Sequence, residues 1–301
     1  MGTVISHTVG SGFLWQKTGK IAVVLALLCL AFFLFKPITV KAGFYRVTRY
    51  VLKAQMMWQT RTWDELEGTH FIVRYLPQDD NIADMVLASA EKDYQPVSQN
   101  FGYLSQERIL VVIYPTKQSL GRSFGWAADE SAMGVYWAGV IRVLSPNVWV
   151  EEENPAHVRW VFESEGPMAH ELTHLIVDYS TGGNYTRWFT EGIAQYEEAK
   201  LTGYRMEHDE IRHPDEMYPL IKMDGEFDSL ENQNLAYFES YQAVKFLVEN
   251  YGEESLREIL DSLSKGRSMK ASFRSTLGIA IDQFERDFKM WSVQNSSNDK
   301  P

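Results

Sequence analysis

The stretch His170-Glu171-Leu172-Thr173-His174 places two imidazoles and a carboxylate within a few consecutive residues. Residues four apart on a helix share a face, so a helix here lets His170 and His174 bind one metal ion. Glu171 lies one step round the helix, where its carboxylate can reach a water on that metal. A catalytic zinc site needs three protein ligands and one open position. The stretch therefore predicts a helical zinc site with one ligand missing.

The missing ligand is offered by Glu191, within Trp188-Phe189-Thr190-Glu191-Gly192-Ile193-Ala194-Gln195-Tyr196, which has the spacing of a second helix. Pro167 suits the first turn of the helix before it, and Gly182-Gly183 predicts where that helix stops. A bare HExxH arises by chance in roughly one such chain in a hundred. The competing interpretation is an amphipathic helix whose histidines are structural. The two segments together favour zinc, Zn²⁺, as the cofactor.

The pairing of these two segments resembles the gluzincin zinc metallopeptidases, and most closely the bacterial peptidase MA-like family. The resemblance implies that His170, His174 and Glu191 bind zinc and that Glu171 is the general base of peptide-bond hydrolysis. It covers roughly residues 160–290, strongly at the two zinc segments and weakly at Leu235–Leu247.

The order of the remaining segments predicts an α+β fold, with an N-terminal mixed sheet packed on the HExxH helix and a mainly helical C-terminal part. We expect one peptidase domain at 69–294, divided into a strand-rich part at 69–160 and a helical part at 161–294, and a disordered tail at 295–301. Apolar patterns predict strands at 70–75, 108–114, 135–137 and 140–144. Helical spacing occurs at 82–101, 236–250, 254–264 and 281–293.

The N-terminus carries Ile21–Phe35, fifteen residues without a charge. This run is shorter than the ~20 residues that span a bilayer comfortably, although flanking lysines can extend it. A secretory signal cleaved near Val40-Lys41-Ala42 is the alternative, and a buried core helix is a third. We therefore expect a membrane anchor or signal peptide at 1–42 and a juxtamembrane linker, or a juxtamembrane helix, at 43–68.

The predicted location is a membrane-anchored domain outside the cytoplasm, or a secreted one if the signal is cleaved. The excess of basic residues after the apolar run argues instead for a cytoplasmic domain. The chain has a formal net charge of −11, and no acidic residue precedes Asp64. The folded part is therefore more acidic still, which argues against nucleic acid or anionic lipid as its partner. Its single cysteine, Cys29, lies in the apolar run, so thiolate ligands are excluded from the folded part.

A second catalytic group is expected on a helix beside the metal, where a tyrosine can stabilise the developing oxyanion. Tyr241 is the first choice and Tyr237 the second, with packing in the core as the alternative for both. Metal-bound histidines also need acceptors for their second ring nitrogen. Gln195 and Asp178, each one turn beyond a ligand, are the candidates.

The substrate is expected to be a peptide or protein. An edge strand within Met133–Leu144 would pair with an extended peptide, with an ordinary interior strand as the alternative. Aminopeptidases of related families carry Gly-x-Met-Glu-Asn, whereas this chain has Ser131-Ala132-Met133-Gly134. The missing glutamate favours an endopeptidase.

Two other classes of function stay open. One is a noncatalytic zinc-stabilised binding module on the same fold, against which the presence of Glu171 argues. The other is a membrane-assembly component. His208 and His213 lie in a polar, acidic stretch and are expected to be solvated rather than ligands.

Overall fold

The computed structural model describes residues 37–125, 132–151, 154–206 and 213–295. Its contacts divide the chain into a unit at Met1–Tyr45 and a second unit at Arg46–Pro301. Ile21–Phe35 lies outside the described residues. Among the helices that are described, none combines the length and the apolar character needed to cross a bilayer. Membrane anchoring therefore stays a prediction.

A five-stranded mixed sheet forms the centre of the second unit, in the order β1-β2-β3-β5-β4. Strands β2, β3 and β5 are parallel, whereas β1 and β4 pair antiparallel at the two edges. Every residue of β3 and β5 is buried, as expected for parallel strands covered on both faces. The strand bounds are Asp64–Glu67 (β1), Phe71–Tyr75 (β2), Ile109–Tyr114 (β3), Gly134–Trp137 (β4) and Val140–Leu144 (β5).

The strands predicted at 135–137 and 140–144 form a hairpin, which places β4 at the edge of the sheet. Its two turn residues, Ala138 and Gly139, both have positive φ, at 51° and 84°. Two-residue hairpins favour this geometry because its twist matches that of the flanking strands. Gly139 adopts it without strain, whereas Ala138 accepts a conformation that is unusual for a residue with a side chain.

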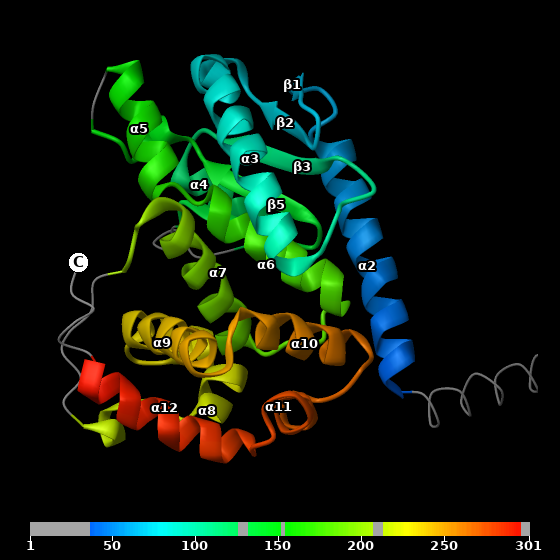
Figure 1. Cartoon of the computed structure of the whole chain (residues 1–301). Coiled ribbons are helices and arrows are strands. Elements are labelled where there is room, and N and C mark those ends of the chain that lie inside the picture. The colour runs from blue at the N-terminus through cyan, green and yellow to red at the C-terminus, as the bar shows by residue number, and fades with distance from the viewer. Residues whose placement is uncertain (1–36, 126–131, 152–153, 207–212, 296–301) are drawn as a thin grey trace, which may run out of the picture. The chain divides into compact units, whose positions relative to one another are not determined.

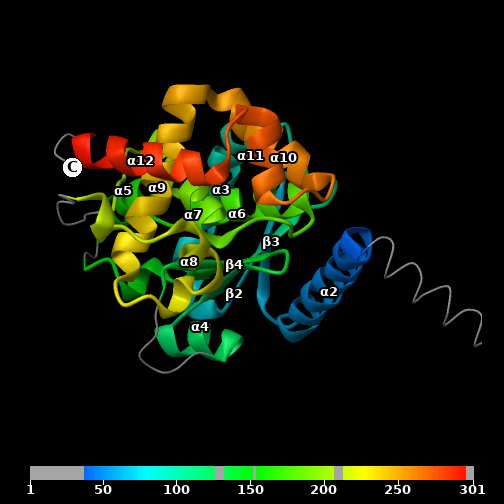
Figure 2. The ribbon, with the colours of Figure 1, turned by 90° about the horizontal axis from the view of Figure 1, so that it is seen from below.

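Helices cover both faces of the sheet (Figures 1 and 2). On one face, α3 (Asp80–Phe101) and α6 (Met168–Thr181) pack on side chains of alternate strand positions such as Val73, Val111 and Ile141. On the other face, α4 (Lys117–Phe124) packs on Leu110, Val112 and Leu144. Helix α5 (Pro155–Glu165) adds Val158 and Phe162 to the first of these cores. The predicted α+β fold, with the sheet packed on the HExxH helix, is confirmed.

The segment 43–68, expected as a juxtamembrane helix or linker, is helical to Gln59 and belongs to the folded unit from Arg46 onward. Helix α2 (Pro37–Gln59) buries Met56 in the core behind the sheet, where it packs with Leu110 and Leu120. Strand β1 then extends the sheet by pairing with β2. Only one face of α2 is buried, and the sequence of the helix mixes basic with aromatic residues. No apolar pattern in the sequence therefore indicated that α2 packs on the core behind the sheet. The domain therefore begins well before residue 69.

The C-terminal helices surround a separate aromatic core that includes Trp188, Phe189, Val244, Phe273 and Phe284. The predicted helices at 236–250, 254–264 and 281–293 are all present. The last of them continues to Asn295, one residue into the predicted tail, and residues 296–301 lie outside the described part. The bounds are Arg187–Thr202 (α7), Leu220–Gly225 (α8), Gln233–Tyr251 (α9), Glu253–Ser264 (α10), Met269–Leu277 (α11) and Ile281–Asn295 (α12). Short 3₁₀ turns occur at Pro77–Asp79, Pro146–Val148, Pro214–Glu216 and Phe227–Ser229.

Helices α7 and α9 cross in close contact at Gly192. A Cβ atom added to this glycine would meet the Ser240 carbonyl oxygen at 2.1 Å and Val244 Cγ2 at 2.6 Å. Because the first obstacle is backbone, no side-chain rotation relieves it. Gly192 therefore sets the distance between the two helices.

We predict that Gly192→Ala destabilises the protein by about 1–3 kcal/mol, because the added methyl group must push α9 away. The better helix propensity of alanine offsets at most about 1 kcal/mol of this. Urea unfolding followed by circular dichroism measures the change. Gly225→Ala is the matched control, since nothing lies within 4 Å of the Cβ position there. Equal stability of the two variants would contradict the steric explanation.

Candidate metal centre

Helix α6 presents the HExxH motif because one of its faces belongs to the core. Leu172, Leu175 and Ile176 pack against the sheet and α3, which turns the two histidines towards α7. The helix starts after Pro167 and ends at Gly182, which has a φ of 64° and whose N–H bonds the Asp178 carbonyl. Both predicted boundaries are confirmed. The local sequence thus fixes both ends and the orientation of the motif.

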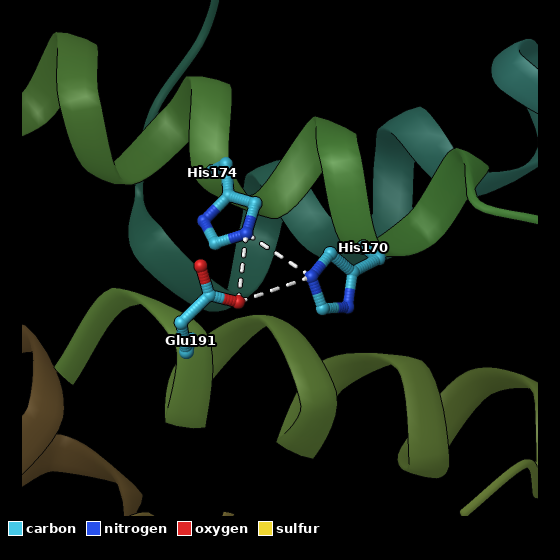
Figure 3. A group of neighbouring side chains, drawn as sticks. All are labelled: His170, His174 and Glu191. Carbon is cyan, nitrogen blue, oxygen red and sulfur yellow. Dashed lines mark hydrogen bonds and ion pairs between the residues drawn. The ribbon is translucent and has the colours of Figure 1, made fainter. Parts of the chain in front are cut away.

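The structure brings His170, His174 and Glu191 together, and we call these three residues the metal triad (Figure 3). The two Nε2 atoms lie 3.0 Å apart. Glu191 Oε2 lies 3.5 Å from Nε2 of His170 and 3.4 Å from Nε2 of His174. These ligand atoms come from two helices, α6 and α7, and converge on one small volume. This is the arrangement that the sequence predicted for zinc.

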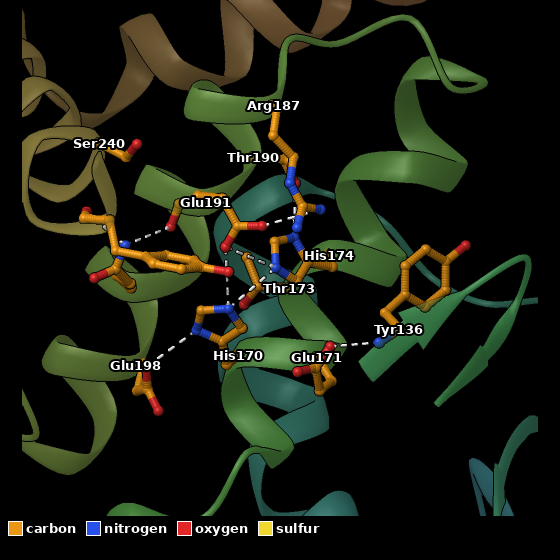
Figure 4. A network of polar contacts seen from close by, with 12 residues as sticks. Tyr136, His170, Glu171, Thr173, His174, Arg187, Thr190, Glu191, Glu198 and Ser240 are labelled. Atoms are coloured by element: carbon orange, nitrogen blue, oxygen red, sulfur yellow. Dashed lines mark hydrogen bonds and ion pairs between the residues drawn. The ribbon is translucent and has the colours of Figure 1, made fainter. Parts of the chain in front are cut away.

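Each imidazole is oriented by an oxygen at its other ring nitrogen (Figure 4). Nδ1 of His170 lies 3.1 Å from Glu198 Oε2, and Nδ1 of His174 lies 2.8 Å from Thr190 Oγ1. A carboxylate only accepts, so His170 keeps a proton on Nδ1 and is left with Nε2 to bind a metal ion. Such contacts fix the tautomer and ring plane of a metal ligand. Both histidines are therefore prepared to bind through Nε2.

The two predicted outer partners, Gln195 and Asp178, were wrong. Gln195 donates to the Tyr237 carbonyl at 2.8 Å and so joins α7 to α9. Asp178 is fully buried and is bound by Arg49 at 2.7 Å and by the Tyr136 hydroxyl. The sequence did carry a signal for Glu198, since it follows Glu191 by seven residues and so shares its helix face.

Glu191 is buried, with 2% of its side chain exposed, and its other oxygen, Oε1, lies 3.1 Å from Arg187 Nη1. Burial alone raises the pKa of this carboxyl, but the charges of His174 and Arg187 outweigh burial and hold the pKa well below its usual range. Burial lowers the pKa of His170, yet its contacts with Glu191 and Glu198 raise it well above the ordinary value. The triad therefore attracts positive charge.

The donor set fits a zinc ion. Two imidazole lone pairs and a carboxylate oxygen within 3.5 Å of one another repel unless a cation or a proton lies among them. Nitrogen and carboxylate donors are those of catalytic zinc sites. Three ligands also leave a tetrahedral ion one position for solvent or substrate.

Glu171 is buried beside the triad, with 6% of the residue exposed. Its Oε2 accepts a hydrogen bond from the backbone N–H of Tyr136 on the edge strand β4. Burial raises the pKa of Glu171, the two histidines lower it, and Glu191 raises it again, so the net pKa is raised. A carboxylate with a raised pKa is a better proton acceptor, which suits a general base.

A pocket of about 270 Å³ opens onto this group. Its lining includes His170, Glu171, Gly134 of the edge strand, and both predicted tyrosines. Tyr237 has a raised pKa, caused first by the negative charge of Glu191 and then by burial. Its hydroxyl therefore lies within electrostatic reach of the triad. Tyr241 lines the same pocket and is 8% exposed.

The remaining candidates lie away from the triad. Trp188 and Phe189 are buried in the helical core. His213 is exposed, in agreement with the prediction of a solvated side chain, and His208 lies outside the described residues.

A family model described as Peptidase MA superfamily matches residues 90–294, more than half of the chain. The chain belongs to the peptidase MA superfamily. The match includes both zinc segments, so the sequence resemblance to this family is confirmed. A curated relative, the uncharacterized protein YhcO of Bacillus subtilis, is 24% identical over 242 residues, which are 71% of each chain.

Two solved structures are similar in part. One is a two-domain M1 zinc metallopeptidase mutant bound to L-arginine, with 16% identity and a TM-score of 0.39. The other is an M1 zinc metallopeptidase mutant from Deinococcus radiodurans, with 15% identity and a TM-score of 0.35. Each comparison covers 76% of this chain and 50% of the other, so the chain matches about half the length of these proteins.

We predict that Glu198→Gln weakens zinc binding by about 10–100-fold, because His170 loses the charged acceptor that orients it. Competition with a chromogenic chelator measures the zinc affinity directly. Glu197→Gln is the matched control, since Glu197 is also buried on α7 but bonds Asn100 instead of a ligand. Unchanged affinity in Glu198→Gln, or an equal loss in both variants, would contradict an orienting role.

Proposed function

We propose that the protein is a zinc-dependent peptidase that cleaves internal peptide bonds. The single observation that carries the proposal is the position of Glu171 in one pocket with His170 of the metal triad. A binding module stabilised by zinc has no need of a buried carboxylate with a raised pKa beside its metal. The family membership and the donor set support the same conclusion.

A zinc ion held by His170, His174 and Glu191 would supply Lewis acidity and activate water for attack at neutral pH. Glu171 accepts the proton of the attacking water and passes it to the leaving nitrogen. The N–H of Tyr136 holds the Glu171 carboxylate in place for this transfer. Arg187 keeps Glu191 ionised, so that the ligand set retains its negative charge.

Tyr237 is the better-supported donor to the developing oxyanion, because it is electrostatically coupled to Glu191 and, more weakly, to Glu171. This reverses the order predicted from the sequence, which placed Tyr241 first. Both hydroxyls belong to α9 and line the pocket. A donor aimed at the oxyanion stabilises the transition state more than the bound substrate.

The substrate that we propose is an extended peptide beside the edge strand β4. An edge strand offers unpaired backbone groups to a peptide. At Gly134, the position where related aminopeptidases carry a glutamate for the substrate's α-amine, this chain has no side chain. An internal bond is therefore a better substrate than an N-terminal one. We further propose that the domain acts outside the cytoplasm, held at a membrane or secreted after cleavage of the signal.

We predict that Glu171→Gln retains zinc but lowers peptide cleavage by about 10²–10⁴-fold, because the general base is lost. Zinc content by atomic spectroscopy and cleavage of a library of peptides blocked at both ends measure the two properties separately. Loss of zinc from the variant would assign Glu171 to metal binding. If the zinc-loaded wild type cleaves no member of the library, the noncatalytic binding module becomes the better explanation.

We predict that Tyr237→Phe lowers kcat by about 10²–10³-fold with little change in KM, as expected for loss of one oxyanion donor. Tyr241→Phe is the matched control, since it removes a hydroxyl from the same helix and pocket. Steady-state kinetics on one blocked peptide compares them. A larger fall for Tyr241→Phe would restore the order predicted from the sequence.

A further inference from the structure

Helix α2 carries an apolar stripe on its outer face. Val47, Tyr50, Val51 and Trp58 are 62%, 72%, 55% and 64% exposed. Their spacing of three, four and seven residues places them on one side of a helix. Ala54 and Met57, which lie between them on the same side, are exposed as well. We call these six residues the α2 stripe.

The stripe cannot be buried by rotating the helix, because the opposite face already contacts the domain. Met56 is 5% exposed in the core behind the sheet. Arg49 binds the buried Asp178 at 2.7 Å and stacks on the Tyr179 ring at 3.6 Å from its centroid. Lys53 pairs with Glu107 at 3.1 Å. These contacts fix the rotation of α2, so that the stripe faces away from the domain.

Basic residues border the stripe. Arg46, Arg49, Lys53 and Arg108 line a pocket of about 310 Å³ beside α2, together with Tyr50 of the stripe itself. Arg49, Lys53 and Arg108 are ion-paired with Asp178, Glu107 and Glu67, whereas Arg46 is outside these pairs. The folded part as a whole is acidic, but helix α2 contains no acidic residue along its whole length. An apolar face with a positive border is the pattern of helices that lie in a membrane interface.

We propose that α2 lies, from Val47 to Trp58, on the surface of an anionic lipid bilayer. The α2 stripe enters the boundary between headgroups and acyl chains, and Arg46, the basic residue of the pocket outside these ion pairs, faces lipid phosphates. Tyr50 and Trp58 suit this depth because each joins an apolar ring to a polar group. In the sequence, the uncharged run Ile21–Phe35, which is the predicted membrane anchor, ends directly before α2.

Charge favours lipid over a second copy of the chain. Two α2 helices packed along their stripes would bring basic borders together without an acidic residue on either helix to pair with them. Such like charges repel across a helix pair. Anionic headgroups supply the missing negative charge. The ion pair between Arg49 and Asp178 joins this surface to α6, so lipid contact would also orient the metal-binding helix relative to the membrane.

The test uses the full chain with Cys29→Ser and single new cysteines carrying an environment-sensitive fluorophore. Val51→Cys and Trp58→Cys place the label on the stripe. Gln59→Cys is the matched control, because Gln59 is exposed and adjacent to Trp58 but points away from the stripe. The proteins are reconstituted in phosphatidylcholine vesicles with or without phosphatidylglycerol, and lipids brominated on their acyl chains serve as quenchers.

We expect several-fold stronger quenching at positions 51 and 58 than at 59, and a larger difference when phosphatidylglycerol is present. Equal, weak quenching at all three positions would show that the stripe faces water and would overturn the proposal. Disulfide formation between copies of the unlabelled Val51→Cys protein, together with fluorescence of the labelled protein that depends on protein concentration instead of brominated lipid, would identify a second copy as the occupant and would overturn the proposal. If quenching is stronger at positions 51 and 58 than at 59 but does not depend on phosphatidylglycerol, the proposal that the bilayer is anionic is overturned. None of these outcomes depends on zinc or on peptide cleavage.

Discussion

The buried carboxylate of Glu191 is the constraint on which the rest of the site depends. Removing an ionised carboxylate from water costs several kcal/mol unless partners compensate. Here Arg187, one turn earlier on α7, and the two imidazoles of α6 provide that compensation. Helix α7 must therefore cross α6 where the histidines face it. Gly192, the next residue, then lets α9 approach close enough to line the pocket.

Tyr136 connects the sheet to the catalytic helix through two separate contacts. Its backbone N–H binds Glu171, and its hydroxyl binds Asp178, two turns further along α6. Both carboxylates are buried, so each needs a donor, and one residue of the edge strand satisfies part of that need for both. Arg49 completes the arrangement from α2. The base is thus positioned by a chain of contacts that reaches from the N-terminal helix to β4.

Local patterns in the sequence were sufficient for strands β2 to β5, most of the helices and the metal triad. The spacing of His170 and His174 determines that they share a face, and only α6 needs to form for that prediction to hold. The partner of Asp178 depends on which element packs against α6, and spacing does not encode that choice. Asp178 finds Arg49, which is 129 residues away in the sequence. The same limitation explains why α2 and β1 were taken for a juxtamembrane helix or linker.

The contact between Tyr136 and Glu171 also bears on where a peptide can lie. In an antiparallel pair, alternate residues direct their backbone groups towards the neighbouring strand and away from it. Because the N–H of Tyr136 reaches Glu171, its backbone points away from β5, and so does that of Gly134, two residues earlier. Glu171 already occupies one outward donor. If a peptide pairs with β4 as proposed and leaves Glu171 in place, it pairs beside Gly134, where a Cβ atom would collide with Pro167 and Glu171. The glycine lets β4 lie against α6, and it thereby brings the proposed peptide-binding edge close to the proposed general base.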